Sequence, residues 1–150
     1  MELALKANTT TEATFLLIDD DLISIMSMKR ALKKLKIVNK TLVAKDGQEA
    51  LDILRQAVVA GAGKLPPFIV TLDINMPRMN GIEFLEAIRA DPCLQRLVVF
   101  VFTTSDMPDD VQSAYSKNIA GYLVKDDLGD KLADALDMLG SYARIVELPV

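Results

Sequence analysis

The sequence predicts an α/β protein with a doubly wound parallel sheet, and two observations support this prediction. Five short apolar segments alternate with five segments of helical periodicity along the chain. Strict alternation of strand and helix is typical of a parallel sheet whose right-handed crossovers place helices on both faces. The length of 150 residues suits one domain, with a core that needs no disulfide or metal.

The expected strands are short runs rich in β-branched or aromatic residues, at 15–18, 41–44, 68–72, 97–102 and 121–124. Three of these runs are apolar nearly throughout instead of alternating with polar residues. Such runs are typical of strands that helices cover on both faces. The sheet is therefore expected to be buried between two layers of helices.

The expected helices carry apolar residues at helical spacing and lie at 22–35, 47–59, 81–90, 109–117 and 128–142. Asp21 precedes the first of them and is placed to cap its N-terminus. In the same helix, Met26 and Met28 are expected to fill the core. The glycine-containing stretch 61–64 lacks the earlier glycine and the final hydroxyl of a phosphate-binding loop, so it is interpreted as a flexible loop.

Composition excludes several classes of function. The chain has no histidine, which removes catalytic triads and histidine-based metalloprotease motifs, and with one cysteine it cannot form the usual structural zinc sites. Cys93 has no internal disulfide partner, which fits a reducing compartment. The net charge of −4 argues against nucleic-acid binding. We find no secretory signal, and the longest apolar run, 97–102, is too short to span a membrane. A cytoplasmic protein with no membrane partner is expected.

Polar side chains follow four of the expected strands, at Asp19–Asp21, Asp73, Thr103–Ser105 and Lys125. In a doubly wound sheet these carboxyl ends meet at one edge, where such folds bind their ligands. Helix capping accounts for one of the aspartates at 19–21. It does not explain why three of them lie next to a fourth, Asp73, on a neighbouring strand. Because close carboxylates repel, we expect a cation among them, and oxygen ligands favour Mg²⁺ or Mn²⁺.

Lys125 and Thr103 would be unremarkable alone, as a solvated lysine and a strand-end hydroxyl. Beside an acidic cluster, the ammonium can hold a transferred phosphoryl group and the hydroxyl can donate to one of its oxygens. A metal, a carboxylate, a lysine and a hydroxyl together indicate phosphoryl transfer, with a carboxylate as nucleophile.

Five motifs, in this order and spacing, resemble the response-regulator receiver domains of two-component signalling: Leu16–Asp21, Asp46–Leu51, Leu72–Gly81, Phe102–Ser105 and Gly121–Lys125. The resemblance covers residues 14–142. It leaves 1–13 as an N-terminal extension and 143–150 as a C-terminal tail. It implies a flavodoxin-like (βα)5 fold with a five-stranded parallel sheet in the order 2-1-3-4-5.

The resemblance also implies roles for single residues. Asp73 is the expected phosphoacceptor, and Mg²⁺ or Mn²⁺ is expected to bind Asp19, Asp20, Asp73 and the backbone carbonyl of Asn75. The phosphoryl group is expected to contact Thr103, Thr104 and Lys125, with Lys125 paired to Asp73 or to its phosphate. Thr103 would move with the phosphoryl group, and Tyr122 would be its aromatic switch partner.

One position departs from the family pattern. Where receivers usually have proline after the lysine, this chain has Asp126. Because a cis bond without proline costs about 3–4 kcal/mol, we expect a trans bond after Lys125. Asp126 or Asp127 is then available to cap the last helix.

The non-proline residue and the ending of the chain, 142–149, resemble stand-alone regulators that accompany phytochrome-type histidine kinases. This narrower resemblance implies such a kinase as partner and a homodimer in which the apolar tail 143–150 acts as a dimer arm. The alternative is that the last helix runs on and packs against its own domain.

The sequence thus predicts a non-enzymatic phosphoacceptor that takes a phosphoryl group from a kinase phosphohistidine onto Asp73. It would assist its own phosphorylation and dephosphorylation, and signal to a downstream protein by contact or by phosphorelay. Two alternatives remain. A degenerate receiver would only bind proteins, and a phosphatase of the haloacid-dehalogenase type would need an acid where Asn75 stands.

Overall fold

The sheet of the molecule is parallel and five-stranded, in the order β2-β1-β3-β4-β5, which confirms the predicted fold class and strand order. The structure is a computed structural model and describes residues 12–128 and 131–149. Its strands are β1 (Thr14–Ile18), β2 (Thr41–Ala44), β3 (Phe68–Leu72), β4 (Val98–Thr103) and β5 (Gly121–Val124).

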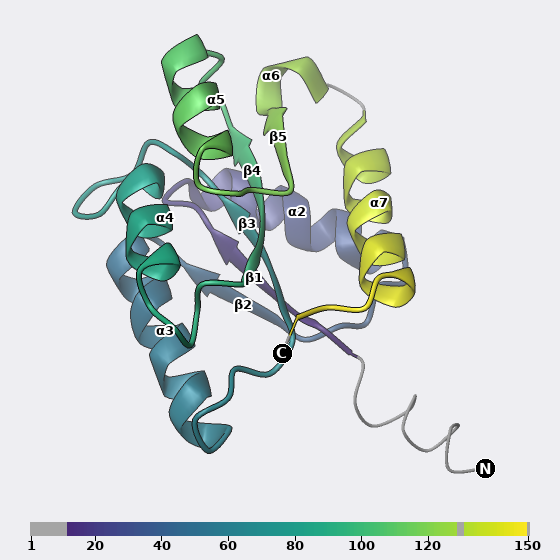
Figure 1. Ribbon diagram of the computed structural model, residues 1–150. Helices are drawn as coiled ribbons and strands as arrows, with labels where there is room; N and C mark the ends of the chain where they lie inside the picture. The colour runs from purple at the N-terminus through teal and green to yellow at the C-terminus, as the bar shows by residue number, and fades with distance from the viewer. Residues whose placement is uncertain (1–11, 129–130, 150) are drawn as a thin grey trace.

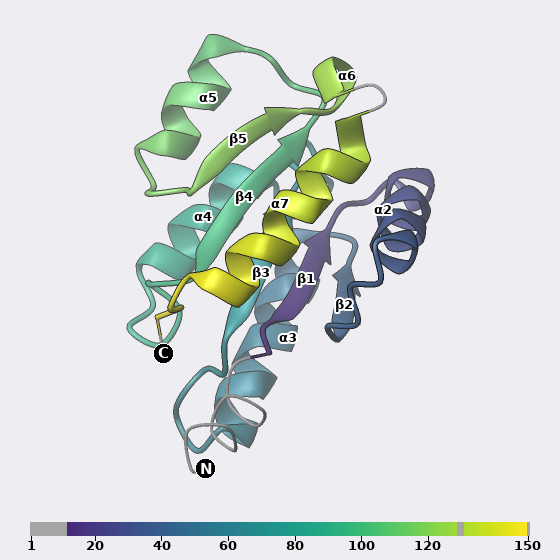
Figure 2. The same ribbon diagram turned by 90° about the vertical axis from the view of Figure 1, so that its right-hand side faces the viewer.

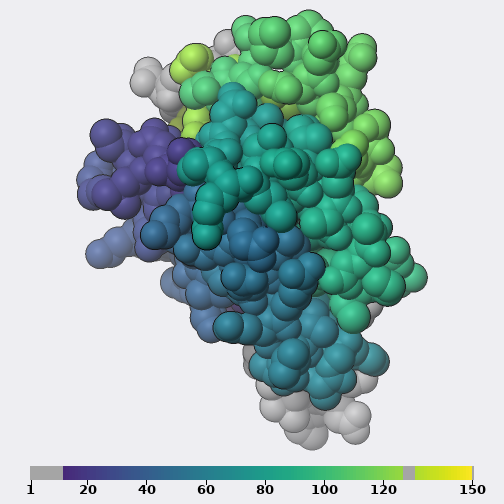
Figure 3. All heavy atoms as spheres, turned by 90° about the vertical axis from the view of Figure 1, so that its left-hand side faces the viewer, coloured from purple at the N-terminus to yellow at the C-terminus, as the bar shows by residue number. Residues whose placement is uncertain are grey.

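Helices cover the sheet in two layers (Figures 1 and 2). The helices are α2 (Leu22–Lys34), α3 (Gly47–Ala60), α4 (Gly81–Arg89), α5 (Pro108–Tyr115), α6 (Lys125–Leu128) and α7 (Leu132–Ile145). One layer holds α2 and α7, and the other holds α3, α4 and α5, which form the face seen in Figure 3. Each layer buries its own apolar cluster against the sheet.

The central strands explain why the sequence shows continuous apolar runs. Every residue of β3 is buried, and β3 is hydrogen-bonded to β1 on one side and to β4 on the other. A strand with neighbours on both edges and helices on both faces has no side exposed to water, so no polar alternation is required.

Two sequence-based expectations were wrong. Met28 is 3% exposed, as expected, but Met26 is 50% exposed, because it follows directly after the buried Ile25 and therefore turns away from the core. The last helix, expected to begin at 128 after a cap by Asp126 or Asp127, begins at Leu132 as α7. Instead α6 begins at Lys125, and Lys131 precedes α7 without a side-chain capping bond.

The last helix runs on beyond the expected domain boundary at 142 and ends at Ile145. Beyond it, Leu148 packs against the cluster under α2 and α7, and Pro149 lines a hollow that Phe68, at the start of β3, also lines. Leu148 thus contacts the chain's own domain, and the dimer arm stays a prediction. The expected extension 1–13 lies outside the described residues except for its last two.

The described residues contain no cis peptide bond, so the bond after Lys125 is trans as expected.

Over the described parts of the chain, no helix combines the length and apolar character needed to cross a bilayer.

Candidate functional site

Three aspartates from two neighbouring strands meet at the carboxyl edge of the sheet. Ile18 and Leu72 are paired in the β1–β3 register, so the residues that follow them, Asp19 and Asp73, leave the sheet side by side. Each of Asp19, Asp20 and Asp73 offers a carboxylate oxygen within 4.8 Å of the other two. We call these three residues the acidic cluster. Asp19 and Asp73 are buried, and Asp20 is exposed.

The ammonium group of Lys125 neutralises part of this charge. Its Nζ lies 2.5 Å from Oδ2 of Asp19 and donates to Oγ of Ser24 at 3.3 Å. A direct pair with Asp73 was one of the expected arrangements, but the salt bridge in the structure is with Asp19. The other oxygen of Asp19 accepts a bond from the backbone N–H of Asp21, which orients the carboxylate toward the lysine.

Asp73 is a buried carboxylate whose pKa is raised by its surroundings. Burial raises its pKa, and the charge of Asp19 raises it further, while a hydrogen bond from Thr103 and the charge of Lys125 act in the opposite direction. Three carboxylates that share one ammonium carry a net negative charge in a confined space. Their oxygen donors could hold a divalent cation, which would relieve the repulsion.

The loop after β4 connects Thr103 to Tyr122. Thr103 is fully buried at the end of β4, and its Oγ1 accepts a hydrogen bond from the backbone N–H of Ser105 at 3.3 Å. The hydroxyl of Tyr122 donates to the backbone carbonyl of Ser105 at 2.9 Å. The Ser105 hydroxyl in turn donates to Asp110 in the first turn of α5. A displacement of Thr103 would therefore disturb this whole set of bonds.

The remaining predicted site residues, Asn75 and Thr104, are exposed on the loops that follow β3 and β4. The first of these loops is held close to α4 by Gly81. A Cβ at this glycine would lie 2.4 Å from the carbonyl oxygen of Asp73 and 2.8 Å from Cα of Ile74. Because both atoms belong to the backbone, no side chain can rotate out of the way. Glycine is therefore required for α4 to begin directly against the acidic cluster.

A salt bridge anchors the same loop from the other side. Arg78 adopts a positive φ of 63° and places its guanidinium 2.7 Å from Oδ2 of Asp46. Asp46 also caps α3 by accepting from the backbone N–H of Glu49, and these bonds outweigh burial and lower the pKa of Asp46. The N–H of Gly47 donates to the carbonyl of Met79 at 3.0 Å. The loops after β2 and β3 are thus joined below the acidic cluster.

Sequence reasoning missed two features of the site. The first is the Ser24 hydroxyl, which bridges Lys125 and the cap residue Asp21. Its position three residues after a helix cap was the available signal. The second is a set of exposed apolar side chains on α2 beside the cluster, Leu22, Ile23 and Met26, which are 69%, 75% and 50% exposed. We call these three residues the apolar edge.

A hollow of about 190 Å³ adjoins the apolar edge. Ile23 and Ser24 line it on α2, Lys125 lines it at the end of β5, and Phe102 and Leu132 complete it. Lys125 therefore borders both the acidic cluster and this mostly apolar depression.

Comparison with known proteins gives a family match over most of the chain. The model of the response regulator receiver domain matches residues 15–137. A regulatory protein of Methanothrix harundinacea, FilR2, is 36% identical over 110 residues, which cover 73% of this chain and 70% of that protein. The response regulator Rcp1 of Synechocystis is 33% identical over 110 residues, covering 73% of this chain and 74% of Rcp1. Some curated relatives are longer, and the chain spans only about half of their length, as with 53% of the response regulator NarL of Escherichia coli.

Solved structures agree with the sequence matches. The phosphorylated cyanobacterial phytochrome response regulator RcpA superposes with a TM-score of 0.79 at 26% identity, over 93% of this chain and 99% of RcpA. The Mn²⁺-bound form of Rcp1 superposes with a TM-score of 0.77 at 29% identity, over 92% of this chain and 99% of Rcp1.

Proposed function

This chain belongs to the family of response regulator receiver domains of two-component signalling, and on that premise we propose that it accepts a phosphoryl group from a kinase phosphohistidine onto Asp73. The observation that carries the proposal is the acidic cluster. A buried carboxylate from β3 lies within 4.8 Å of two others and near the lysine that follows β5. This gathering of carboxylates and a lysine at one edge of the sheet supports the proposal.

In the proposed step, a carboxylate oxygen of Asp73 attacks the phosphorus of phosphohistidine. A P–O bond forms, the P–N bond breaks, and the imidazole of the donor keeps the electron pair and takes up a proton. The product is an acyl phosphate on Asp73. Most of Asp73 is buried, at 7% exposure, so the donor must reach it from the carboxyl edge of the sheet, where β3 ends.

Charge is the main obstacle, since an anionic phosphoryl group must approach an anionic cluster. Asp19, Asp20, Asp73 and the backbone carbonyl of Asn75 would hold Mg²⁺ or Mn²⁺, and the oxygen-rich donor set fits such an ion. When bound, the cation neutralises the carboxylates and the phosphoryl oxygens. The Mn²⁺-bound relative Rcp1 supports this choice of metal.

Lys125, Thr103 and Thr104 are the proposed contacts of the phosphoryl group itself. The ammonium of Lys125 contacts Asp19 and Ser24. On phosphorylation it would leave Asp19 and pair with the phosphoryl oxygens instead. The hydroxyl of Thr103 lies near enough to Asp73 to lower its pKa, and the Thr104 backbone amide follows it. Movement of Thr103 toward the new phosphate would break its bond with the Ser105 N–H. Through Ser105 this would release the Tyr122 hydroxyl and shift an existing equilibrium of α5.

The apolar edge indicates where the phosphodonor protein docks. Large apolar side chains beside a charged site lose contact with water when a partner covers them. A histidine kinase, of phytochrome type as the names of the relatives suggest, would cover Leu22, Ile23 and Met26 while its phosphohistidine reaches Asp73. Output would follow by protein contact or phosphorelay.

A homodimer through the tail is part of the proposal. Ile145, at the end of α7, is 80% exposed, whereas Leu148 packs on the domain itself. Ile145→Ser therefore tests the dimer without disturbing the fold. A dimeric wild type and a monomeric variant in light scattering support it, and a monomeric wild type contradicts it.

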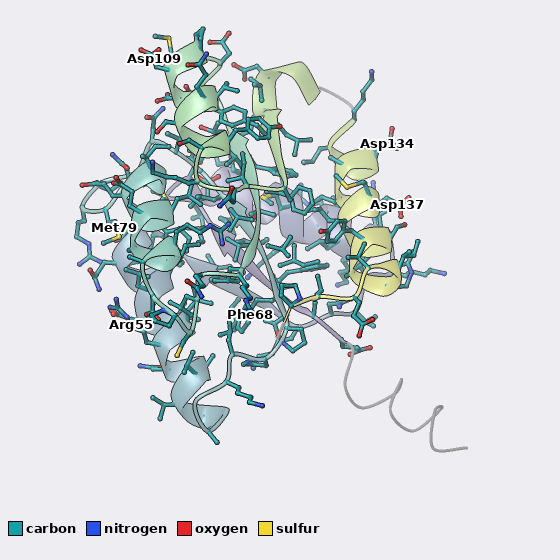
Figure 4. The ribbon with its side chains drawn as sticks, in the orientation of Figure 1. Arg55, Phe68, Met79, Asp109, Asp134 and Asp137 are labelled. Atoms are coloured by element: carbon teal, nitrogen blue, oxygen red, sulfur yellow. The ribbon has the colours of Figure 1, made fainter. Side chains whose placement is uncertain are left out.

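The phosphoacceptor role is tested with acetyl phosphate and Mg²⁺, followed by a phosphate-affinity gel and intact mass measurement. The wild type should gain one phosphoryl group, and the gain should disappear in Asp73→Asn and in the presence of EDTA. Asp137→Asn, an exposed aspartate on α7, is the matched control and should be phosphorylated as the wild type is (Figure 4).

The alternatives give different results in the same experiment. A degenerate receiver shows no modification in the wild type. Rapid turnover of unrelated phosphoesters with no stable product indicates the phosphatase alternative. Modification that persists in Asp73→Asn would place the phosphoacceptor elsewhere.

A further inference from the structure

Basic residues gather in one segment of this acidic protein. Residues 22–45 contain 7 of the 17 basic residues and none of the 21 acidic ones. Five of the seven lie on the second half of α2 and on the turn that follows it, at Lys29, Arg30, Lys33, Lys34 and Lys36. All five are exposed. We call these five residues the basic surface.

Among the described residues, no salt bridge pairs these charges. In the described parts of the chain, the two salt bridges are Arg78–Asp46 and Lys125–Asp19, and neither involves the basic surface. The exposed aspartates labelled on α7, Asp134 and Asp137, project from the outer side of that helix, and Asp109 lies at the start of α5 (Figure 4). The described residues therefore form no ion pair with the basic residues of α2.

The basic surface also has a definite shape. A hollow of about 310 Å³ lies between the end of α2 and the start of β2. It is lined by three lysines, three apolar residues and one threonine: Lys29, Lys33, Lys36, Leu32, Ile37, Val38 and Thr41. Val38 is 81% exposed at the rim, and the positive φ of 58° at Lys36 turns the chain around the hollow. In Figure 2, α2 stands at the outer edge of its layer beside β2, so this region is open to approach.

We propose that this hollow binds an acidic segment of a partner protein, in which carboxylates pair with the lysines and an apolar side chain contacts Val38. The proposal concerns a surface separate from the acidic cluster and goes beyond phosphoryl transfer. Unpaired charges of one sign around an apolar floor favour a ligand that offers both opposite charge and an apolar group.

The surroundings favour a short protein segment over an extended polyanion. The helix α2 is about 20 Å long, and its other end begins at Asp21, beside the acidic cluster. A nucleic acid or an anionic membrane would extend over this negative region and over a chain of net charge −4. A short acidic segment can end before it.

The test uses a fluorescein-labelled peptide of alternating glutamate and leucine, with binding to the full chain followed by fluorescence anisotropy at about 150 mM salt. The variant Lys29→Glu, Lys33→Glu, Lys36→Glu should bind at least about tenfold more weakly than the wild type. The control Arg55→Glu, Lys64→Glu, Arg96→Glu has the same net charge, and its three residues are exposed and lie outside the basic surface. Arg55 points outward from α3, in the opposite helical layer (Figure 4). This control should stay within about threefold of the wild type.

The competing outcomes are separate. Equal weakening in both variants would show that only net charge matters and would overturn the proposal, as would no binding at about 100 μM protein. Tighter binding of a thymidine oligonucleotide or of phosphatidylserine vesicles than of the peptide would assign the surface to another class of ligand. A peptide with serine in place of leucine should bind more weakly; equal binding would contradict the role of Val38. Phosphorylation of the triple variant by acetyl phosphate, compared with the wild type, checks that its fold is intact.

Discussion

Replacing Asp73 by asparagine should stabilise the metal-free protein at neutral pH. The substitution keeps the size of the side chain and its ability to accept the hydrogen bond from Thr103, but it removes one negative charge from the acidic cluster. Because the other two carboxylates stay, the change in the free energy of unfolding reports the repulsion that Asp73 experiences.

The magnitude follows from the geometry. Oxygens of Asp19 and Asp73 lie within 4.8 Å of each other, and two unit charges at that separation repel by about 3.5 kcal/mol at an effective dielectric constant of about 20. The ammonium of Lys125 opposes this repulsion from beside Asp19. A net gain of about 1–2 kcal/mol is expected for Asp73→Asn, after the lysine is taken into account. For a domain of this size the corresponding rise in Tm is about 2–8 °C.

The pH dependence has a defined sign. Burial and the charge of Asp19 raise the pKa of Asp73 in the folded state above the ordinary value of 3.8. Below pH 3.8 the side chain is protonated in both the folded and the unfolded state, so Asp73 costs the fold no electrostatic energy there. As the pH rises through the folded-state pKa, the buried side chain becomes charged and the free energy of unfolding decreases. The advantage of Asp73→Asn should be full at neutral pH and should vanish below about pH 3.8.

Urea unfolding in EDTA, at neutral and at acidic pH, measures this difference. Asp137→Asn on the outer side of α7 is the control and should change stability by less than about 0.5 kcal/mol. Addition of Mg²⁺ should stabilise the wild type more than Asp73→Asn, since binding to the folded state adds to its stability. The reasoning is refuted if Asp73→Asn is no more stable than the wild type at neutral pH, or if its advantage is the same at acidic pH.

Three further substitutions are tested by urea unfolding, two beside the site and one, Arg89, where the loops before β4 and β5 meet. Gly81→Ala should lower the free energy of unfolding by about 3 kcal/mol, because the added Cβ meets the backbone of Asp73 and Ile74. The control is Gly121→Ala, whose Cβ meets only the ring of Phe100. A loss for Gly81→Ala no larger than for this control would contradict the prediction. Asp46→Ala should cost about 1–2 kcal/mol by loss of the α3 cap and the Arg78 bridge. Since the pKa of Asp46 is lowered in the fold, the cost of Asp46→Ala should shrink as the pH falls below 3.8. A cost that stays constant with pH would argue against a stabilising role of the Asp46 charge. Arg89→Met should cost about 3 kcal/mol because the half-buried guanidinium donates to the carbonyls of Gln95, Leu97, Lys117 and Asn118. Full rescue by Arg89→Lys would show that charge alone suffices.

The fold was predictable because its signals are local. The bounds of β2, β3 and β5 agree with the predicted segments to the residue. Each is an apolar run that ends where polar residues, proline or glycine begin, and the alternation of strands and helices leaves few topologies. The capping role of Asp21 was equally local, because a cap bonds to an amide two residues away.

Other features depend on contacts between distant parts of the chain. The pattern of α2 could not separate Met26 from Met28, because the direction of each side chain depends on where the sheet and α7 lie. The partner of Lys125 is 106 residues away, and Arg78 lies 32 residues from Asp46. Motif order indicated which residues approach the sheet edge, but only the packed structure shows that Lys125 contacts Asp19 instead of Asp73.

The helix α2 connects the two proposals in a way that constrains how partners approach. Its first turns carry the apolar edge beside the acidic cluster, and its second half carries the basic surface. A partner that docks on both must present an apolar contact and its phosphohistidine at one end, and carboxylates about 15–20 Å away at the other. A partner docked in the reverse direction would place its acidic segment against Asp19 and Asp20, where like charges repel. The charge pattern of one helix thus favours a single orientation of the bound partner, and the triple substitution of Lys29, Lys33 and Lys36 should slow phosphorylation by that partner while leaving acetyl phosphate unaffected.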